Sequence, residues 1–137
     1  PIRRQLDIYW PDLHRPPFNE RFWRYEYNKH GYCSSNIYNS SDYFKKALTL
    51  RQDPSLDILR ILTAAGLGPG ASHRYVDIET AIKKRIGKKP ALRCKKLWGY
   101  HGTLSEITLC YDYYGQQLID CPQSAINCAA TNVMFPR

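Results

Sequence analysis

The sequence predicts an α+β protein, with helices in the N-terminal two-thirds packed on an antiparallel β-sheet that is cross-linked by disulfides. Two observations predict this class. Apolar residues recur at helical spacing up to residue 86, and β-prone residues with a turn signal follow residue 90. Four of the five cysteines fall in the last third of the 137 residues. Because no linker or internal repeat divides the chain, we expect a single domain over residues 1–137.

Apolar spacing, caps and breakers define the helical part. The first helix starts after Pro1, and Pro16-Pro17 interrupts the pattern that follows it. Asn19 is a plausible N-cap of the second helix. The expected helices are residues 2–10, 19–30, 41–50, 54–65 and 76–86, with Gly66 and Gly87 as stops. In the last two we expect Leu56, Leu59, Ile61, Leu62, Val76, Ile78, Ile82 and Ile86 to face inward.

The C-terminal part predicts strands and constrains the cysteines. Residues 104–111 and 117–121 flank the turn at Tyr113-Tyr114-Gly115, which indicates a hairpin, and residues 132–135 read as a short closing strand. Four cysteines allow three connectivities. Facing strands favour Cys110–Cys121, which leaves Cys94–Cys128 as the enclosing bridge. Cys33 is left over, and we expect its partner on another chain or segment.

The net charge of +8 is concentrated in one stretch. Between residues 83 and 96 the chain holds basic residues and no acidic ones: Lys83, Lys84, Arg85, Lys88, Lys89, Arg93, Lys95 and Lys96. Such a stretch favours a polyanion such as nucleic acid. The alternative is a solvated surface that only keeps the protein in solution.

The cysteines and one sequon point to the same compartment. Disulfides persist in oxidising environments, and Asn39-Ser40-Ser41 is an acceptor sequence for N-linked glycans. No apolar run approaches the roughly 18 residues of a membrane span. We therefore expect a secreted protein, extracellular or vacuolar, glycosylated at Asn39 and without a membrane partner.

One segment carries candidate chemistry. On a helix Glu26 and His30 are four residues apart and share a face, which Lys29 borders. An imidazole can exchange a proton near neutral pH, and a lysine can stabilise a developing negative charge. The alternative is an ordinary amphipathic helix with an ion pair and aromatic core residues. Metal ligands at suitable spacing are lacking, and His14, His73 and His101 read as exposed loop residues.

The same segment resembles the second active-site signature of the ribonuclease T2 family of secreted endoribonucleases. The resemblance rests on Phe22-Trp23-x-x-Glu26-x-x-Lys29-His30-Gly31-x-Cys33, Trp10-Pro11-Asp12-Leu13, Tyr43-Phe44, Leu92-x-Cys94, Glu106-Ile107-x-Leu109-Cys110 and Ile119-Asp120-Cys121-Pro122. The amino-acid sequence of residues 25–31, together with the basic net charge, looks most like the plant self-incompatibility branch of this family.

The resemblance implies a reaction and roles for residues. His30 would remove the proton of a ribose 2′-hydroxyl, and Glu26 and Lys29 would stabilise the phosphorus centre that forms the 2′,3′-cyclic phosphate. This reaction uses no metal or other cofactor. The resemblance makes RNA the substrate, with Phe22, Trp23 and Tyr25 in binding it; Asp12 matches a base-contacting position of some relatives.

Two departures from the family pattern bear on activity. Tyr25 stands where the family usually has a phosphate-binding histidine, and a phenol carries no positive charge near neutral pH. The first active-site signature, with the histidine that protonates the leaving group, has no counterpart here. We therefore expect a C-terminal portion that is completed by an N-terminal chain linked through Cys33 and active only in that assembly.

Three functions remain as alternatives. The first is the assembled endoribonuclease, whose basic stretch attracts RNA or contacts a self-incompatibility recognition protein. The second is an inactive storage or defence protein of the same fold, which Tyr25 favours and the intact Glu26, Lys29 and His30 oppose. The third is a module that binds RNA without cutting it.

Overall fold

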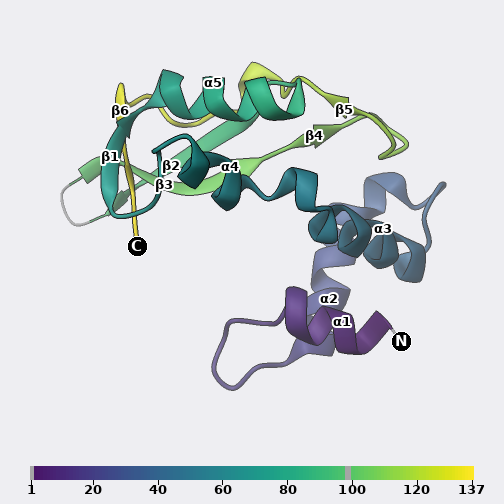
Figure 1. Cartoon of the computed structure of the whole chain (residues 1–137). Coiled ribbons are helices and arrows are strands. Elements are labelled where there is room, and N and C mark those ends of the chain that lie inside the picture. The colour runs from purple at the N-terminus through teal and green to yellow at the C-terminus, as the bar shows by residue number, and fades with distance from the viewer. Residues whose placement is uncertain (1, 98–99) are drawn as a thin grey trace. The chain divides into compact units, whose positions relative to one another are not determined.

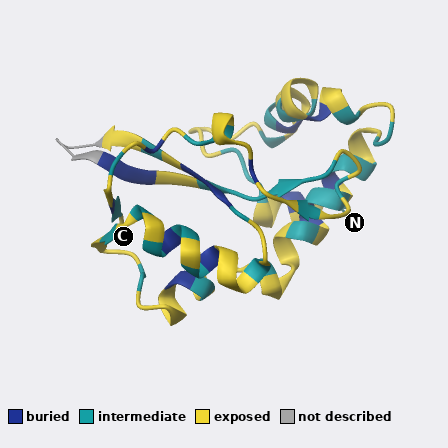
Figure 2. Ribbon diagram, turned by 90° about the horizontal axis from the view of Figure 1, so that it is seen from above, coloured by how far each residue is buried: buried dark blue, intermediate teal, exposed yellow. Residues whose placement is uncertain are grey.

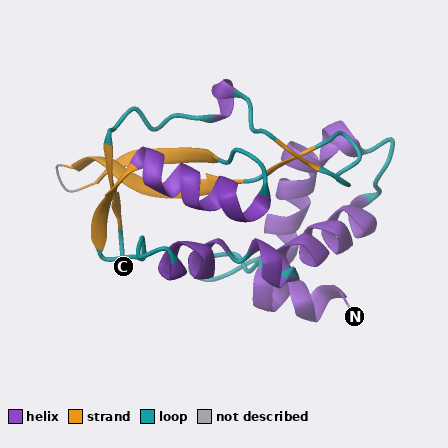
Figure 3. Cartoon of the chain, turned by 45° about the horizontal axis from the view of Figure 1, so that its top comes forward, coloured by secondary structure: helices purple, strands orange, loops and turns teal. Residues whose placement is uncertain are grey.

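The computed structural model describes residues 2–97 and 100–137. Pro1, expected at the start of the first helix, lies outside the described residues. The chain forms two compact units, residues 1–56 and 57–137. Figure 3 distinguishes their helices from their strands. The expectation of a single domain over residues 1–137 stays a prediction.

The first unit is helical. Its helices are α1 (Ile2–Tyr9), α2 (Asn19–Glu26) and α3 (Ser40–Gln52) (Figure 1). One buried side chain from α1, one from α2 and two from α3 form its core: Leu6, Trp23, Phe44 and Leu48. Aromatic rings extend this core, and Trp10 meets Phe44 edge-on with ring centroids 5.4 Å apart. Burial of these apolar and aromatic groups stabilises the helix arrangement.

The second helix ends earlier than expected. Instead of continuing to residue 30, the α-helix stops at Glu26 and a π-helical turn, Tyr27–Gly31, follows. Gly31 is buried, and a Cβ there would lie 2.5 Å from the Cδ2 atom of Tyr27. Glycine is therefore required by the close approach of the Tyr27 ring. The Tyr27 hydroxyl donates to the Tyr38 carbonyl at 2.9 Å, which holds that ring in place.

Two asparagines differ in their helix-capping roles. We had expected Asn19 to be the N-cap of α2, but it is the first residue of the helix. Its Nδ2 donates to Asp7 at 2.7 Å. Asn39 caps α3 instead, since its Oδ1 accepts from the Asp42 backbone N–H at 3.0 Å. An asparagine at the N-cap satisfies one of the unpaired N–H groups of the first turn.

The second unit pairs helices with a mixed four-stranded sheet. Its main elements are α4 (Ile58–Ala64), β1 (Ala71–Arg74), α5 (Tyr75–Ile86), β2 (Ala91–Leu97), β3 (Tyr100–Thr108) and β6 (Asn132–Phe135). The strand order is β1-β6-β3-β2. The pairs β1–β6 and β2–β3 are antiparallel, but β3 and β6 run parallel. The expected all-antiparallel sheet is therefore wrong at this one pairing.

Buried residues from both helices and three strands form the core of this unit. They include Leu62 of α4, Ile78 and Ile82 of α5, and Leu92, Leu104 and Val133 of the sheet. Figure 2 shows buried and exposed residues alternating along α5. Leu59 and Val76, expected to face inward, are instead 54% and 50% exposed. Helix α4 begins after the Asp57 cap, and residues 54–56 form a separate 3-10 turn, which shifts the buried face.

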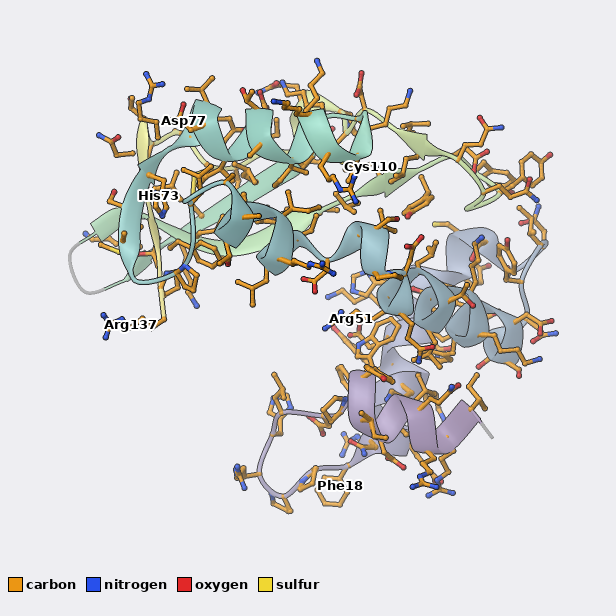
Figure 4. All side chains as sticks on the ribbon, in the orientation of Figure 1. Phe18, Arg51, His73, Asp77, Cys110 and Arg137 are labelled. Atoms are coloured by element: carbon orange, nitrogen blue, oxygen red, sulfur yellow. A yellow bond between two sulfur atoms is a disulfide. The ribbon has the colours of Figure 1, made fainter. Side chains whose placement is uncertain are left out.

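Two strands were absent from the sequence prediction. β1 contains His73, which we had placed in an exposed loop; His73 is half-buried and its Nε2 lies 2.8 Å from the Gly68 carbonyl oxygen (labelled in Figure 4). β2 holds three residues of the basic stretch, Arg93, Lys95 and Lys96, and its pairing with β3 is not evident from these charged side chains. His101 lies in β3 rather than in a loop, and its side chain lies outside what the structure describes.

The predicted hairpin and both predicted disulfides are present. β4 (Cys110–Tyr111) pairs antiparallel with β5 (Leu118–Ile119). Cys110 is bonded to Cys121 and Cys94 to Cys128. The bond between Cys94 and Cys128 joins β2 to the segment that precedes β6, and both of these cysteines pack in the core of the second unit.

Two further features of the described residues concern the surface. Within this part of the chain, no helix has the length and apolarity needed to cross a membrane. In the basic stretch, Lys89 pairs with Glu79 at 3.4 Å and Arg93 with Glu106 at 3.3 Å. The cations that make no ion pair with a described residue are Lys83, Lys84, Arg85, Lys88, Lys95 and Lys96.

Candidate active site

The end of α2 and the π-helical turn carry the candidate catalytic residues. Tyr25 and Glu26 belong to the last turn of α2, whereas Lys29 and His30 belong to the π-helical turn. Glu26 is half-buried and the other three are exposed. Single π-helical turns widen a helix and are frequent at functional sites, because they redirect the side chains of the turn.

Lys29 interacts with both neighbouring groups of the motif. Its Nζ lies 5.3 Å from the centroid of the Tyr25 ring. Hydrogen bonding to Tyr25, helped by the Glu26 carboxylate, raises the pKa of Lys29 above its ordinary value. Lys29 is therefore fully charged at neutral pH and provides a cation for an anionic ligand.

Glu26 lies between this cation and the core of the first unit. Burial, with a smaller contribution from the Glu26 carboxylate, raises the pKa of Tyr43. Tyr43 packs edge-on against Tyr27, with ring centroids 5.5 Å apart. Glu26 is thus close enough to Lys29 and Tyr43 for its charge to affect the pKa of both, and its half-buried carboxylate remains partly accessible to a substrate.

His30 is exposed and unpaired. The i,i+4 spacing leaves room for an ion pair with Glu26, but neither this pair nor another hydrogen bond of His30 is found among residues 2–97 and 100–137. A free imidazole on the surface of the turn can accept a proton from a ligand that binds there.

A pocket of about 350 Å³ opens beside this cluster. Tyr25 and Phe22 line it from α2, and Phe18 lines it from the loop that precedes the helix. The Phe18 ring is 59% exposed and projects from that loop (Figure 4). Exposed aromatic faces are suitable platforms for nucleobases. Of the residues that line this pocket, the sequence reasoning missed Phe18, His14 and Arg21; the helical spacing of Arg21 to Tyr25 was the available signal.

Asp12 lines the same pocket, but its carboxylate organises the loop. It accepts hydrogen bonds from the backbone N–H groups of His14 and Phe18, each at 3.0 Å, and its Oδ1 lies 2.6 Å from the His14 Nδ1. The two backbone bonds, with the imidazole of His14, lower the pKa of Asp12 to about 2. Its side chain is only 7% exposed. These partners occupy much of the hydrogen-bonding capacity that a base would need.

Trp23 has a structural position rather than the expected substrate-binding one. The residue is 7% exposed and lies among Leu6, Phe44 and Leu48. Its Nε1 donates to the Trp10 carbonyl at 2.7 Å. A ring buried in this way presents little surface to a base, so we assign Trp23 to the core that orients α2.

The remaining candidate positions lie at the surface. The thiol of Cys33 is exposed and free of any bond to a described cysteine. Asn39 is exposed, and its Nδ2 donates to the Asp42 carboxylate at 2.8 Å. Among the described residues, no group of three or more His, Cys, Asp or Glu is placed to hold a metal ion.

Comparison with known proteins identifies the class to which this fold and cluster belong. The model of the ribonuclease T2 family matches residues 1–121. The chain belongs to the ribonuclease T2 family.

Individual relatives are plant ribonucleases. The chain is 36% identical to ribonuclease S-2 of Nicotiana alata over 140 residues, covering 98% of the chain and 62% of that protein. It is 36% identical to extracellular ribonuclease LE of Solanum lycopersicum over 130 residues, covering 93% of the chain and 56% of the relative. Ribonuclease MC1 from bitter gourd seeds superimposes with a TM-score of 0.86 at 32% identity, covering 98% of the chain and 68% of that structure. The chain thus spans less than two thirds of the length of these two curated relatives.

Proposed function

We propose that this chain carries the proton-accepting half of an endoribonuclease site that cleaves single-stranded RNA. The observation that carries the proposal is the grouping of Tyr25, Glu26, Lys29 and His30 at one helix end in a member of the ribonuclease T2 family. RNA is the substrate because the attacking group is the 2′-hydroxyl, which DNA lacks.

The proposed reaction is an intramolecular phosphoryl transfer. His30 takes the proton of the 2′-hydroxyl, and that oxygen forms a bond to the adjacent phosphorus while the bond from phosphorus to the 5′-oxygen breaks. The positive charge of Lys29 stabilises the extra negative charge on the phosphoryl oxygens, and Glu26, beside it in the motif, helps to stabilise the phosphorus centre. The products are a 2′,3′-cyclic phosphate and a free 5′-hydroxyl.

The leaving 5′-oxygen needs a proton from an acid, which we place outside this sequence. The imidazole of His14 contacts the Asp12 carboxylate, and the Nε2 of His73 donates to the Gly68 carbonyl. The side chain of His101 lies outside the described residues. We therefore propose a second polypeptide segment, N-terminal in the family, which supplies the acid and is joined through the exposed thiol of Cys33. A disulfide-linked partner would appear as a heavier band on a non-reducing gel that shifts on reduction, and a monomer with a free Cys33 thiol would contradict it.

Cleavage of RNA tests the main proposal. The complete protein that contains this chain, incubated with single-stranded RNA and EDTA, is expected to give 2′,3′-cyclic ends. His30→Ala should lower kcat by about 10²- to 10⁴-fold, the usual contribution of a positioned acid or base. His73→Gln is the matched control, because a glutamine can still donate to the Gly68 carbonyl. Equal rates for the two variants would remove His30 from the reaction.

Tyr25 supports a second candidate function. A neutral phenol at this position binds phosphate more weakly than an imidazolium does. This favours an inactive storage or defence protein of the same fold as the second candidate. Binding of RNA without cleavage would favour an RNA-binding module instead. Neither binding nor cleavage would favour storage or defence.

The compartment is a further proposal. Two disulfides favour an oxidising environment, and we propose a secreted or vacuolar protein with a glycan on Asn39. A glycan replaces one Nδ2 hydrogen of Asn39 and leaves the other for Asp42, so capping and glycosylation are compatible. Loss of mass after treatment with a glycan-removing amidase tests occupancy. The unpaired cations of residues 83–96 would attract RNA or, in a self-incompatibility role, contact a recognition protein.

A further inference from the structure

Arg21 is an unneutralised cation on the face of α2 that leads to the candidate active site. It is exposed and lines the 350 Å³ pocket together with Tyr25 and Phe22. No ion pair or hydrogen bond of its guanidinium to the described part of the chain is found. An arginine that lines a pocket without a partner is free to bind an anion there.

The position of Arg21 continues the line of Lys29 and Tyr25. Arg21 and Tyr25 are one α-helical turn apart, which places their Cβ atoms about 5 to 6 Å from each other. Lys29 lies on the other side of Tyr25, with its Nζ 5.3 Å from the ring centroid. Along the chain, the neutral Tyr25 ring therefore lies between two cations, one helical turn after Arg21 and four residues before Lys29.

The nearby acids are engaged elsewhere. The carboxylate of Asp12 accepts from the backbone N–H groups of His14 and Phe18 and has only 7% of its side chain exposed. Glu20, the neighbour of Arg21, pairs with Arg3 at 2.8 Å, and Asp7, which lines an adjacent pocket with Arg21, accepts from the Asn19 Nδ2 at 2.7 Å. None of these carboxylates forms an ion pair with Arg21, so its guanidinium donors are available to a ligand in the pocket.

We propose that Arg21 binds the RNA phosphate next to the scissile one and so provides the positive charge that Tyr25 lacks. This inference rests on the proposed function. The planar guanidinium donates two parallel hydrogen bonds to phosphate oxygens, a geometry that a phenol cannot offer. Phe18 and Phe22, which line the same pocket, leave an apolar surface beside the phosphate for the adjoining nucleoside.

Salt-dependent binding of a strand that cannot be cleaved tests the role of Arg21. The probe is a fluorescent single-stranded DNA oligonucleotide, which lacks the 2′-hydroxyl, and the protein is the complete form that contains this chain. Loss of one phosphate contact should lower the slope of log K against log salt concentration by about 0.7 for Arg21→Gln and weaken low-salt binding roughly three- to tenfold. Arg21→Lys should keep the slope, because the charge remains.

Arg4→Gln is the matched control. Arg4 is an exposed arginine of α1 without an ion pair to a described residue, and glutamine has nearly the same helix propensity as arginine. The control should leave the slope unchanged. The inference is overturned if Arg21→Gln and Arg4→Gln have equal effects, or if the wild-type protein does not bind the oligonucleotide.

Kinetics separates this inference from the proposed function. With RNA, Arg21→Gln is expected to raise KM about three- to tenfold with little change in kcat, because binding to a neighbouring phosphate is uniform between ground and transition states. An unchanged KM would count against Arg21. Absence of RNA cleavage by the wild-type protein would refute the endoribonuclease proposal. The salt dependence of binding to the DNA oligonucleotide would still show whether Arg21 contacts a phosphate.

Discussion

Replacing Trp23 by phenylalanine tests whether this residue orients α2 or binds substrate. The indole is 7% exposed, and its Nε1 donates to the Trp10 carbonyl at 2.7 Å. Phenylalanine fits the same space but has no donor and a smaller ring. The substitution therefore removes one hydrogen bond and some buried apolar area in the core that supports the catalytic turn.

The expected loss of stability follows from these two changes. A carbonyl that loses its partner costs about 1 to 3 kcal/mol, and the low end applies here because the Trp10 site is only part-buried. The smaller ring loses the burial of roughly two methylene equivalents at about 0.8 kcal/mol each. We expect the free energy of unfolding to fall by about 2 to 4 kcal/mol, a large part of the stability of an ordinary domain.

Urea unfolding and steady-state RNA cleavage by the complete protein measure the two possible roles. Below the unfolding transition, Trp23→Phe should leave KM unchanged. Phe18→Leu is the contrasting variant, since Phe18 is 59% exposed and lines the pocket. It should raise KM and change stability by no more than about 0.5 kcal/mol. A raised KM for Trp23→Phe without a change in unfolding midpoint would refute the assignment of Trp23 to the core.

Three other experiments with single substitutions test the fold and the site. Leu62→Ala should lower the free energy of unfolding by about 2 to 5 kcal/mol, because Leu62 is fully buried. Leu59→Ala on the same helix should change it by less than about 0.5 kcal/mol, because Leu59 is 54% exposed. Urea unfolding midpoints measure both, and similar losses for the two variants would contradict the orientation of α4. Gly31→Ala forces a Cβ against the Tyr27 ring, so we expect a loss of about 1 to 3 kcal/mol and slower RNA cleavage, and wild-type behaviour would argue against this packing. The pKa of Asp12 is lowered to about 2 in the folded state, so its ionised form stabilises the protein above about pH 4 and this contribution is lost as pH falls toward about 2. The excess stability of wild type over Asp12→Asn should shrink across that interval, and a constant difference in unfolding midpoint would exclude the carboxylate as its source.

The candidate site was predictable where its residues are close in sequence. Glu26, Lys29 and His30 form one motif, and the structure places them at one helix end. What each contacts was not predictable, because contacts depend on distant residues. Trp23 meets the Trp10 carbonyl thirteen positions earlier, and Asp12 is held by Phe18 six positions later. The residue types and motif positions of Trp23 and Asp12 do not reveal these contacts.

The sequence by itself determined the local features: the helical periodicity, the turn between β4 and β5, the pairing of Cys110 with Cys121, and the closing strand β6. These follow from propensity and spacing over a few residues. The tertiary structure alone decided that basic β2 pairs with β3 and that β3 and β6 run parallel. Backbone hydrogen bonds between distant segments define a strand of this kind, and its exposed side chains carry little information about them.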